Sequence, residues 1–461
     1  MRDRNVAFHS EQHRDRIRRQ VHQAYAVDFF NLLTGPELLE MTESHLPEHR
    51  ERLYPPTVAL SMFMKQALEE DRSCQRAVNG WAAQRAAEGL SVHSVSTGAY
   101  CRARGRVPLQ MISALTRASG RLLCERAQEA WLWRGRRVKL ADGTGISMPD
   151  TPSNQACYPQ PSTQTEGVGF PLARLVGIIC LSTGVVLEAA IGPHAGKGRS
   201  ELDLFRSLLP ALSTGDLLLA DALYCNYFLI ATLQAAGVDV LFEQHGARIT
   251  DFRRGEALGK RDHRVRWHKP EARPAWMSRE QYAVFPEELM VRELQVGGRT
   301  LVTTLLEPKE ASKGELAKLY ERRWNIELDL RCIKTTLRME TLSCKSPSMV
   351  QRELWVYLLA YNLIRFLMAQ AAHTAGVQPR ELSFKHTVQM WTTWTALALA
   401  ALPVTHPTEL FRLIAQLRVG NRPRRVEPRA RKRRPKPFPW LKIPRARARR
   451  QIRQHRHRLS A

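Results

Sequence analysis

The sequence predicts a mixed α/β core between a helical N-terminal region and a basic C-terminal tail. Through residue 130, apolar positions recur at three- and four-residue spacing, as in Val58–Met64, which is typical of helices. Between residues 137 and 242, short β-type runs alternate with helical patterns, which favours a sheet flanked by helices. At 461 residues, the chain exceeds what one hydrophobic core usually supports, so we expect two to four structural units.

The elements expected in the core follow one another as β-β-β-α-β-α-β. Asp142-Gly143 closes the first strand, and Ser182-Thr183-Gly184 joins the second and third strands in a hairpin signature. The expected ranges are strands at 137–142, 173–181 and 185–191, a helix at 201–212, a strand at 216–221, a helix at 226–236 and a strand at 238–242. This order matches the ribonuclease H-like fold, a mixed central sheet with flanking helices.

The sequence after residue 243 changes character twice. Residues 244–307 are polar and arginine-rich with β-type runs, which predicts a mainly β insertion into the core. A long helix is then expected over 312–338 and an apolar helix over 349–371.

Charge indicates a polyanionic partner. The formal net charge is +26, and residues 422–461 hold 14 arginines and 3 lysines against the single acid Glu427, a net +16. Five prolines oppose a regular fold in the first half of this tail, so we expect a flexible basic arm that binds DNA phosphates without sequence preference. An RNA-binding or solubilising tail is the alternative. Anionic membranes also fit the charge, but no apolar run approaches the ~20 residues of a spanning helix.

The cysteines give no sign of a metal site. The eight cysteines contain no Cys-x-x-Cys pair and no regular spacing, so neither a zinc site nor a disulfide framework is expected. Unpaired thiols are typical of a reducing compartment, and we expect a cytoplasmic or nucleoid-associated protein.

Three arginines follow a plausible helix start near Ser94. Arg102, Arg104 and Arg106 form an arrangement suited to contacts with the DNA backbone. A solvated basic helix end explains the same residues equally well.

The most informative segment runs from Tyr320 to Lys334. At about 100° per residue, Tyr320, Arg323, Glu327 and Lys334 fall within roughly 60° of arc, beside a separate apolar stripe. Such a helix can dock on a core while presenting a carboxylate for a metal ion and two cations for DNA phosphates. On spacing alone, an exposed charged helix face is the commoner explanation.

The pattern Tyr-x2-Arg-x3-Glu-x6-Lys resembles the signature helix of the IS4 family of bacterial insertion-sequence transposases at every position. Residues 138–152 look like the family's first catalytic block, and residues 218–225 look like the second. Taken singly, Asp142-Gly143 could be a turn and Asp221 a helix cap. The resemblance covers roughly residues 130–365 in order and includes a β-rich insertion before the glutamate.

The resemblance implies a cut-and-paste DNA transposase with Asp142, Asp221 and Glu327 as catalytic carboxylates and metal ligands. The implied cofactor is a pair of divalent metal ions, either Mg²⁺ or Mn²⁺. Water would cleave a strand at the element's end, and the freed 3′-hydroxyl would attack target DNA. The implied partners are the terminal inverted repeats, target DNA and a second copy of the chain in a synaptic complex, with no membrane.

An aromatic residue holds a flipped base in relatives. Trp267 and Trp276 are the candidates here, and Trp324 is a third for which packing is the favoured interpretation.

The sequence departs from the family pattern at one place, because Ala222 occupies a position that is often basic in relatives. An inactive, transposase-derived DNA-binding protein is therefore one alternative. A tyrosine recombinase using Tyr320 or Tyr361 as nucleophile is another.

The domain division expected on this basis is a helical DNA-binding domain (1–130), the first part of the catalytic core (131–243), the insertion (244–307), the second part of the core (308–375), a helical region (376–421) and the arginine-rich tail (422–461).

Overall fold

The computed structural model describes residues 36–46, 53–87, 89–91, 94–194, 196, 200–398, 407–420 and 440–459. The first part of the helical N-terminal region and residues 421–439 of the basic tail therefore lie outside the described residues.

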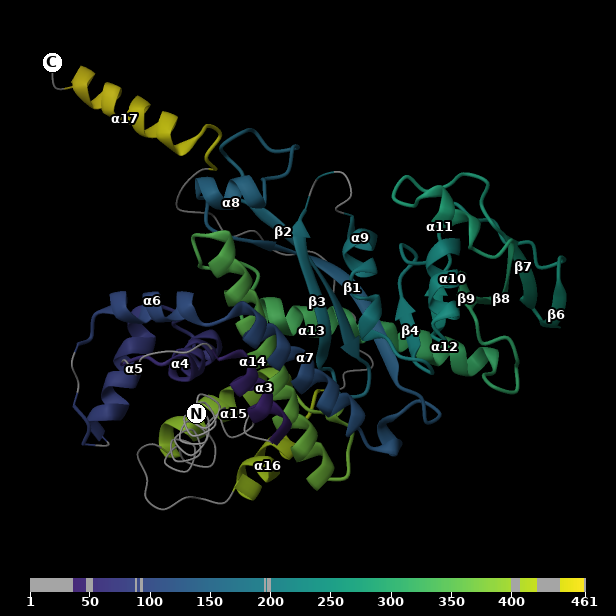
Figure 1. Cartoon of the computed structure of the whole chain (residues 1–461), viewed down its shortest axis with the longest axis horizontal. Coiled ribbons are helices and arrows are strands. Elements are labelled where there is room, and N and C mark those ends of the chain that lie inside the picture. The colour runs from purple at the N-terminus through teal and green to yellow at the C-terminus, as the bar shows by residue number, and fades with distance from the viewer. Residues whose placement is uncertain are drawn as a thin grey trace, which may run out of the picture.

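A nine-stranded mixed sheet forms the centre, in the order β3-β2-β1-β4-β5-β9-β8-β7-β6 (Figure 1). β1 is antiparallel to β2 and parallel to β4, and β4 is parallel to β5. The strands are β1 (Val138–Ser147), β2 (Leu172–Cys180), β3 (Val186–Pro193), β4 (Leu217–Ala220), β5 (Asp239–Glu243), β6 (Glu256–Gly259), β7 (Asp262–His268), β8 (Glu288–Val296) and β9 (Arg299–Thr303).

The expected β-β-β-α-β-α-β order is confirmed, with α9 (Glu201–Arg206) and α10 (Tyr227–Ala235) between the strands. Two details of the prediction were wrong. β1 continues through Asp142-Gly143 to Ser147, because β2 pairs with it along that whole length. The helix expected over 201–212 stops at Arg206, and Pro210 lies in a separate 3₁₀ turn, η2 (Leu209–Ala211).

The insertion extends the central sheet instead of forming a sheet of its own. Its last strand, β9, pairs antiparallel with β5, and β8, β7 and β6 follow outward with the short helix α11 (Arg279–Ala283) between β7 and β8. Figure 1 shows this part at the far end of the sheet from β3. Residues 244–307 thus contain four strands of the central sheet, β6 to β9, and the helix α11.

Helices before residue 130 are continuous with the core. They are α3 (Pro36–His45), α4 (Pro56–Leu68), α5 (Cys74–Ala87), α6 (Thr97–Arg106) and α7 (Leu109–Glu125). α7 packs on β3 and on α14 (Pro347–Thr374), which also contacts α4. Asn362 of α14 donates to the Thr116 and Val186 carbonyls, and a Cβ at Gly120 would lie 2.2 Å from the Val186 oxygen. α7 therefore approaches β3 as closely as a glycine allows.

α14 is long and apolar enough to cross a membrane by length and composition, with 89% of its most apolar window buried inside the protein. The expectation that no apolar run approaches this length was wrong. Its burial between α7, α4, α15 (Phe384–Ala398) and α16 (Pro407–Gln416) is that of a core helix.

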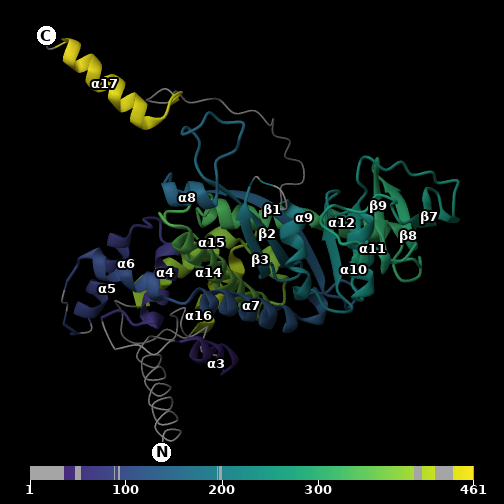
Figure 2. The same ribbon diagram turned by 45° about the horizontal axis from the view of Figure 1, so that its top comes forward.

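The chain's described tail contains a helix that the sequence analysis did not predict. α17 (Arg445–Leu459) carries seven arginines and no acid and extends away from the body of the protein in both ribbon views (Figure 1, Figure 2).

Candidate active site

The parallel pairing of β1 and β4 brings the first two predicted carboxylates together. Leu140 of β1 lies opposite Leu219 of β4, and continuing this register by two residues places Asp142 beside Asp221. Asp221 directly follows β4, and its Oδ1 accepts the Leu223 N–H at 2.9 Å. Sheet pairing thus joins two acids that are far apart in the sequence.

The Asp142 carboxyl group has a pKa raised to about 7. Burial is the largest cause, followed among the raising effects by repulsion from Glu201 and Asp221. The Gly143 N–H, which donates to Asp142 Oδ1 at 2.8 Å, and the Arg323 guanidinium act in the opposite direction. Negative charge at this position is therefore unfavourable without a further cation.

The segment with the third carboxylate was predicted to be one long helix over residues 312–338, and this prediction was wrong. It is divided into α12 (Lys313–Glu321), a 3₁₀ turn η3 (Arg322–Trp324), α13 (Asn325–Arg331) and a π turn η4 (Cys332–Thr336). α13 packs against β1, and buried Ile326, Leu330 and Ile333 form the expected apolar stripe. π turns are frequent at functional sites.

The four signature side chains lie near Asp142, in the middle of β1, and near the end of β4. Tyr320 donates its hydroxyl to the Ala220 carbonyl and Glu243, each at 3.3 Å. Arg323 Nη2 donates to Glu327 Oε1 at 2.9 Å. Glu327 and Lys334 line one cavity of about 370 Å³ together with Asp142, Thr144, Arg331 and Glu340.

The donor set fits a hard divalent cation, because it consists of carboxylate oxygens beside a buried acid whose ionisation is disfavoured. Across the described ranges, however, no three His, Cys, Asp or Glu side chains converge closely enough to hold an ion. Asp142, Asp221 and Glu327 each accept a hydrogen bond from a nearby donor instead.

Sequence reasoning missed a fourth acid at this place, Glu201, the first residue of α9. Tyr224 donates its hydroxyl to Glu201 Oε1 at 3.0 Å, and burial followed by repulsion from Asp221 raises the pKa of Glu201 against the effect of that hydrogen bond. No local pattern could have revealed it, since Ser200 and Asp203 account fully for the helix start through a capping box.

The three tryptophan candidates differ sharply in exposure. Trp267 is 2% exposed and donates to Glu293, so the structure contradicts its predicted role in holding a base. Trp276 is 47% exposed, with the Arg206 guanidinium 3.8 Å from its ring centroid. Trp324 is 53% exposed, which contradicts the expectation that it packs in the core.

Arg102, Arg104 and Arg106 all lie on α6, which starts at the Ser96 cap. Arg104 turns inward, over the rings of Phe63 and Tyr100 at 4.7 and 5.3 Å, so the prediction that it contacts DNA was wrong. Arg102 and Arg106 are exposed.

The alternative of a tyrosine nucleophile has no support in the geometry. Tyr361 is 0% exposed and donates to the Gly184 carbonyl, while Tyr320 is 6% exposed. Burial is the main cause that raises the pKa of both phenols above the ordinary value.

All eight cysteines are free thiols.

Comparison with known proteins identifies the family of the chain. Residues 133–363 match the family model described as "Transposase DDE domain". The chain is 31% identical over 322 residues to the transposase InsG for insertion sequence element IS4 of Escherichia coli strain K12, which covers 67% of this chain and 70% of InsG. A piggyBac transposase synaptic complex with hairpin DNA matches 81% of this chain and 87% of that chain, at 8% identity and a TM-score of 0.38.

Proposed function

The chain belongs to the IS4 family of DDE transposases, insertion-sequence enzymes that act on DNA, and on that premise we propose that Asp142, Asp221 and Glu327 are its catalytic carboxylates. The single observation that supports this most strongly is the shared cavity of Asp142 and Glu327, beside the β4 end that carries Asp221. The proposed core is ribonuclease H-like, with Asp142 on its first strand and Asp221 after its fourth.

Mg²⁺ or Mn²⁺, as two ions, is the proposed cofactor, and Asp142, Asp221 and Glu327 would hold it. When bound, it supplies Lewis-acid stabilisation of the charge that develops in phosphodiester cleavage. Glu327 forms an ion pair with Arg323, and the Glu327 side chain is 34% exposed. Binding of a metal ion by Glu327 requires its carboxylate to leave Arg323. The freed guanidinium would then bind a DNA phosphate.

Lys334 and Tyr320 complete the proposed DNA contacts. Lys334 lines the cavity with Glu327 and forms no ion pair within the described residues, so its ammonium group is available for a phosphate. Tyr320 fixes the signature segment to the end of β4 through the Ala220 carbonyl.

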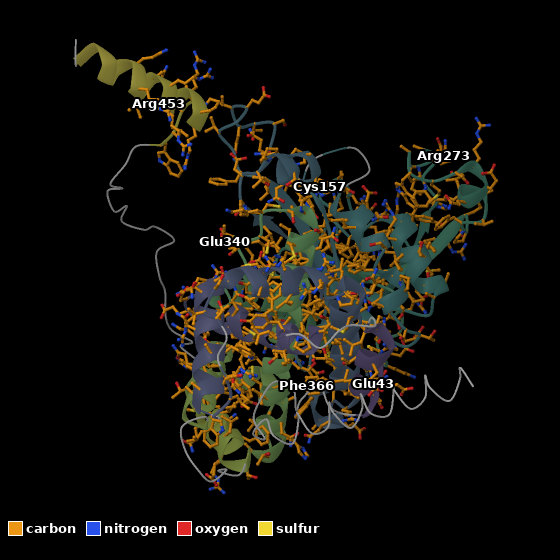
Figure 3. All side chains as sticks on the ribbon, turned by 60° about the vertical axis from the view of Figure 1, so that its left-hand side comes forward. Glu43, Cys157, Arg273, Glu340, Phe366 and Arg453 are labelled. Atoms are coloured by element: carbon orange, nitrogen blue, oxygen red, sulfur yellow. The ribbon has the colours of Figure 1, made fainter. Side chains whose placement is uncertain are left out.

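Trp276 is the proposed platform for a displaced base. It is a large exposed aromatic residue, and Arg206, its stacking partner, lies on the same short helix as Glu201. Base stacking on aromatic rings is sequence-tolerant, as an end-processing step requires. Arg102, Arg106 and the basic tail are proposed to bind DNA backbone, and Figure 3 shows Arg453 on α17, away from the main body.

The proposed reaction is cut-and-paste transposition by a homodimer assembled on the terminal inverted repeats. Hydrolysis at the element's end would free a 3′-hydroxyl, which then attacks a target phosphodiester.

The test is cleavage of short duplexes bearing the element's ends, in Mg²⁺, by wild type and by Glu327→Gln. We expect the variant to lose cleavage and retain DNA binding. Glu321→Gln, the same change at an exposed residue of α12, should cleave as wild type does. Binding by wild type without cleavage in Mg²⁺ or Mn²⁺ would instead favour an inactive DNA-binding protein. A covalent phosphotyrosine adduct would refute the carboxylate mechanism.

A further inference from the structure

Glu201 lies near both aspartates, and its own helix does not require its carboxylate. Its helix α9 is capped by Ser200 and Asp203, whose side chains and backbone N–H groups are reciprocally bonded. Arg206 at the other end pairs with Asp203. The Glu201 carboxylate is therefore not needed to start, end or charge-balance the helix.

The carboxylate is directed at the backbone beside Asp142. A Cβ built on Gly143 would lie 2.4 Å from Glu201 Cδ and 2.5 Å from its Oε2. The Gly143 N–H donates to Asp142 Oδ1 at 2.8 Å, so the backbone that the Glu201 carboxylate contacts is also the backbone that holds Asp142.

Tyr224 holds Glu201 from the other side. It is 0% exposed, its ring packs edge-on against Phe205 of α9 at 5.0 Å, and its hydroxyl donates to Glu201. Its backbone N–H bonds the Asp221 carbonyl at 3.2 Å, so the turn that carries Asp221 also carries the residue that holds Glu201.

The charges at this point are unbalanced. Glu201 repels Asp142, and Asp221 repels Glu201. Within the described ranges, no cationic side chain lies within 4.0 Å of the Glu201 carboxylate, since no ion pair includes it, and Arg174 acts on it at longer range. Burying like charges this close is unfavourable unless a cation enters.

We infer that Glu201 is a fourth carboxylate of the divalent-cation site, held by the Tyr224 hydroxyl against the Gly143 backbone so that it faces the ion bound by Asp142. This inference rests on the proposed function, because it adds a residue to the site of Asp142, Asp221 and Glu327. A residue larger than glycine at position 143 would displace the Glu201 carboxylate from this place.

Mn²⁺ binding to the full chain, measured by electron paramagnetic resonance, tests the inference without any cleavage reaction. We expect Glu201→Gln to weaken Mn²⁺ binding about 10- to 100-fold and Tyr224→Phe to weaken it about tenfold, because both disturb the same carboxylate. Glu321→Gln controls for the loss of one negative charge and should bind as wild type does.

Thermal unfolding without divalent ions gives a second readout. Removing a carboxylate from a repulsive cluster should leave the melting temperature of Glu201→Gln at or above that of wild type, whereas a merely structural role for Glu201 would lower it. Tyr224→Phe keeps the ring packed on Phe205 and tests the inference even if Glu201→Gln does not fold.

The outcomes separate the two claims. If Asp142→Asn loses Mn²⁺ affinity while Glu201→Gln and Tyr224→Phe keep the wild-type value, the inference is overturned and the proposed function stands. If Asp142→Asn and Glu327→Gln also bind with wild-type affinity, the proposed function is overturned with it.

Discussion

Arg323 and Glu327 form a hydrogen-bonded ion pair of 2.9 Å on the segment that faces β1 and β4, with the arginine 14% and the glutamate 34% exposed. The arginine also lowers the pKa of Asp142. It therefore serves as the local cation of the site, and Glu327 must exchange this partner for a metal ion.

We expect Arg323→Ala to reduce cleavage by about 100-fold, because it removes a charge-stabilising donor from the site. Arg323→Lys should recover little of the loss, since an ammonium group cannot reproduce the planar fork of the guanidinium. Single-turnover cleavage of a terminal-repeat duplex measures both. Equal rates for Arg323→Lys and wild type would show that charge alone suffices.

Stability should depend on pH through Asp142. Its pKa is 3.8 in an unperturbed state and about 7 in the folded protein, so the folded state binds the proton more tightly. The free energy of unfolding contributed by this group therefore falls as pH rises from about 4 to about 7.

Asp142→Asn should flatten that part of the profile and be more stable than wild type at pH 8 by ~1–3 kcal/mol. Saturating Mg²⁺ should raise the wild-type melting temperature more at pH 8 than at pH 6, because ligation requires the ionised carboxylate. Urea unfolding from pH 5 to pH 8 measures the slope. Parallel slopes in wild type and variant would refute the assignment.

A buried cluster on the opposite side of α13 fixes the segment to the core. Asp329 is 0% exposed and pairs with Arg365 of α14 at 2.5 Å and with Arg380 at 2.6 Å. Asp329→Ala leaves two buried guanidinium groups without their acid and should cost about 3–5 kcal/mol of unfolding free energy.

The exposed pair of Glu409 and Arg412 supplies the control for this change. Glu409→Ala should cost less than about 1 kcal/mol, because exposed ion pairs contribute little. Denaturant titration of both variants measures the difference, and a loss at Asp329 as small as that at Glu409 would contradict the account.

Deleting residues 422–461 removes 14 arginines and 3 lysines. The slope of log affinity against log salt should become less negative by about 0.9 for each phosphate contact that the arm makes, while the preference for terminal repeats persists. Changing Arg445, Arg447, Arg449 and Arg450 to Gln measures the share of α17. A slope unchanged by the deletion would rule out phosphate binding by the arm.

Local patterns predicted the catalytic elements well. Alternating and helical periodicity located β2, β3, β4, β5 and α10 within a few residues. The angular argument predicted that Tyr320, Arg323, Glu327 and Lys334 share one side, and Glu327 and Lys334 do line one cavity although a 3₁₀ turn precedes Glu327 and a π turn follows it.

Non-local contacts account for what the sequence did not reveal. The pairing of β9 with β5 makes the insertion part of the central sheet, and no periodicity specifies which edge a strand joins. Glu201 reaches the site through contacts with Gly143 and Tyr224, which come from other elements. The local sequence does not distinguish Trp267 from Trp276. In the structure, Trp267 is buried and donates to Glu293, whereas Trp276 is exposed.

The central claim is that Asp142, Asp221 and Glu327 share divalent ions, and crystals of the protein with a DNA end and Mn²⁺ test it most directly. The account predicts anomalous density at ~2.0–2.2 Å from carboxylate oxygens of all three residues, with Glu327 released from Arg323. Manganese density elsewhere, with the Arg323–Glu327 pair intact beside bound DNA, would contradict it.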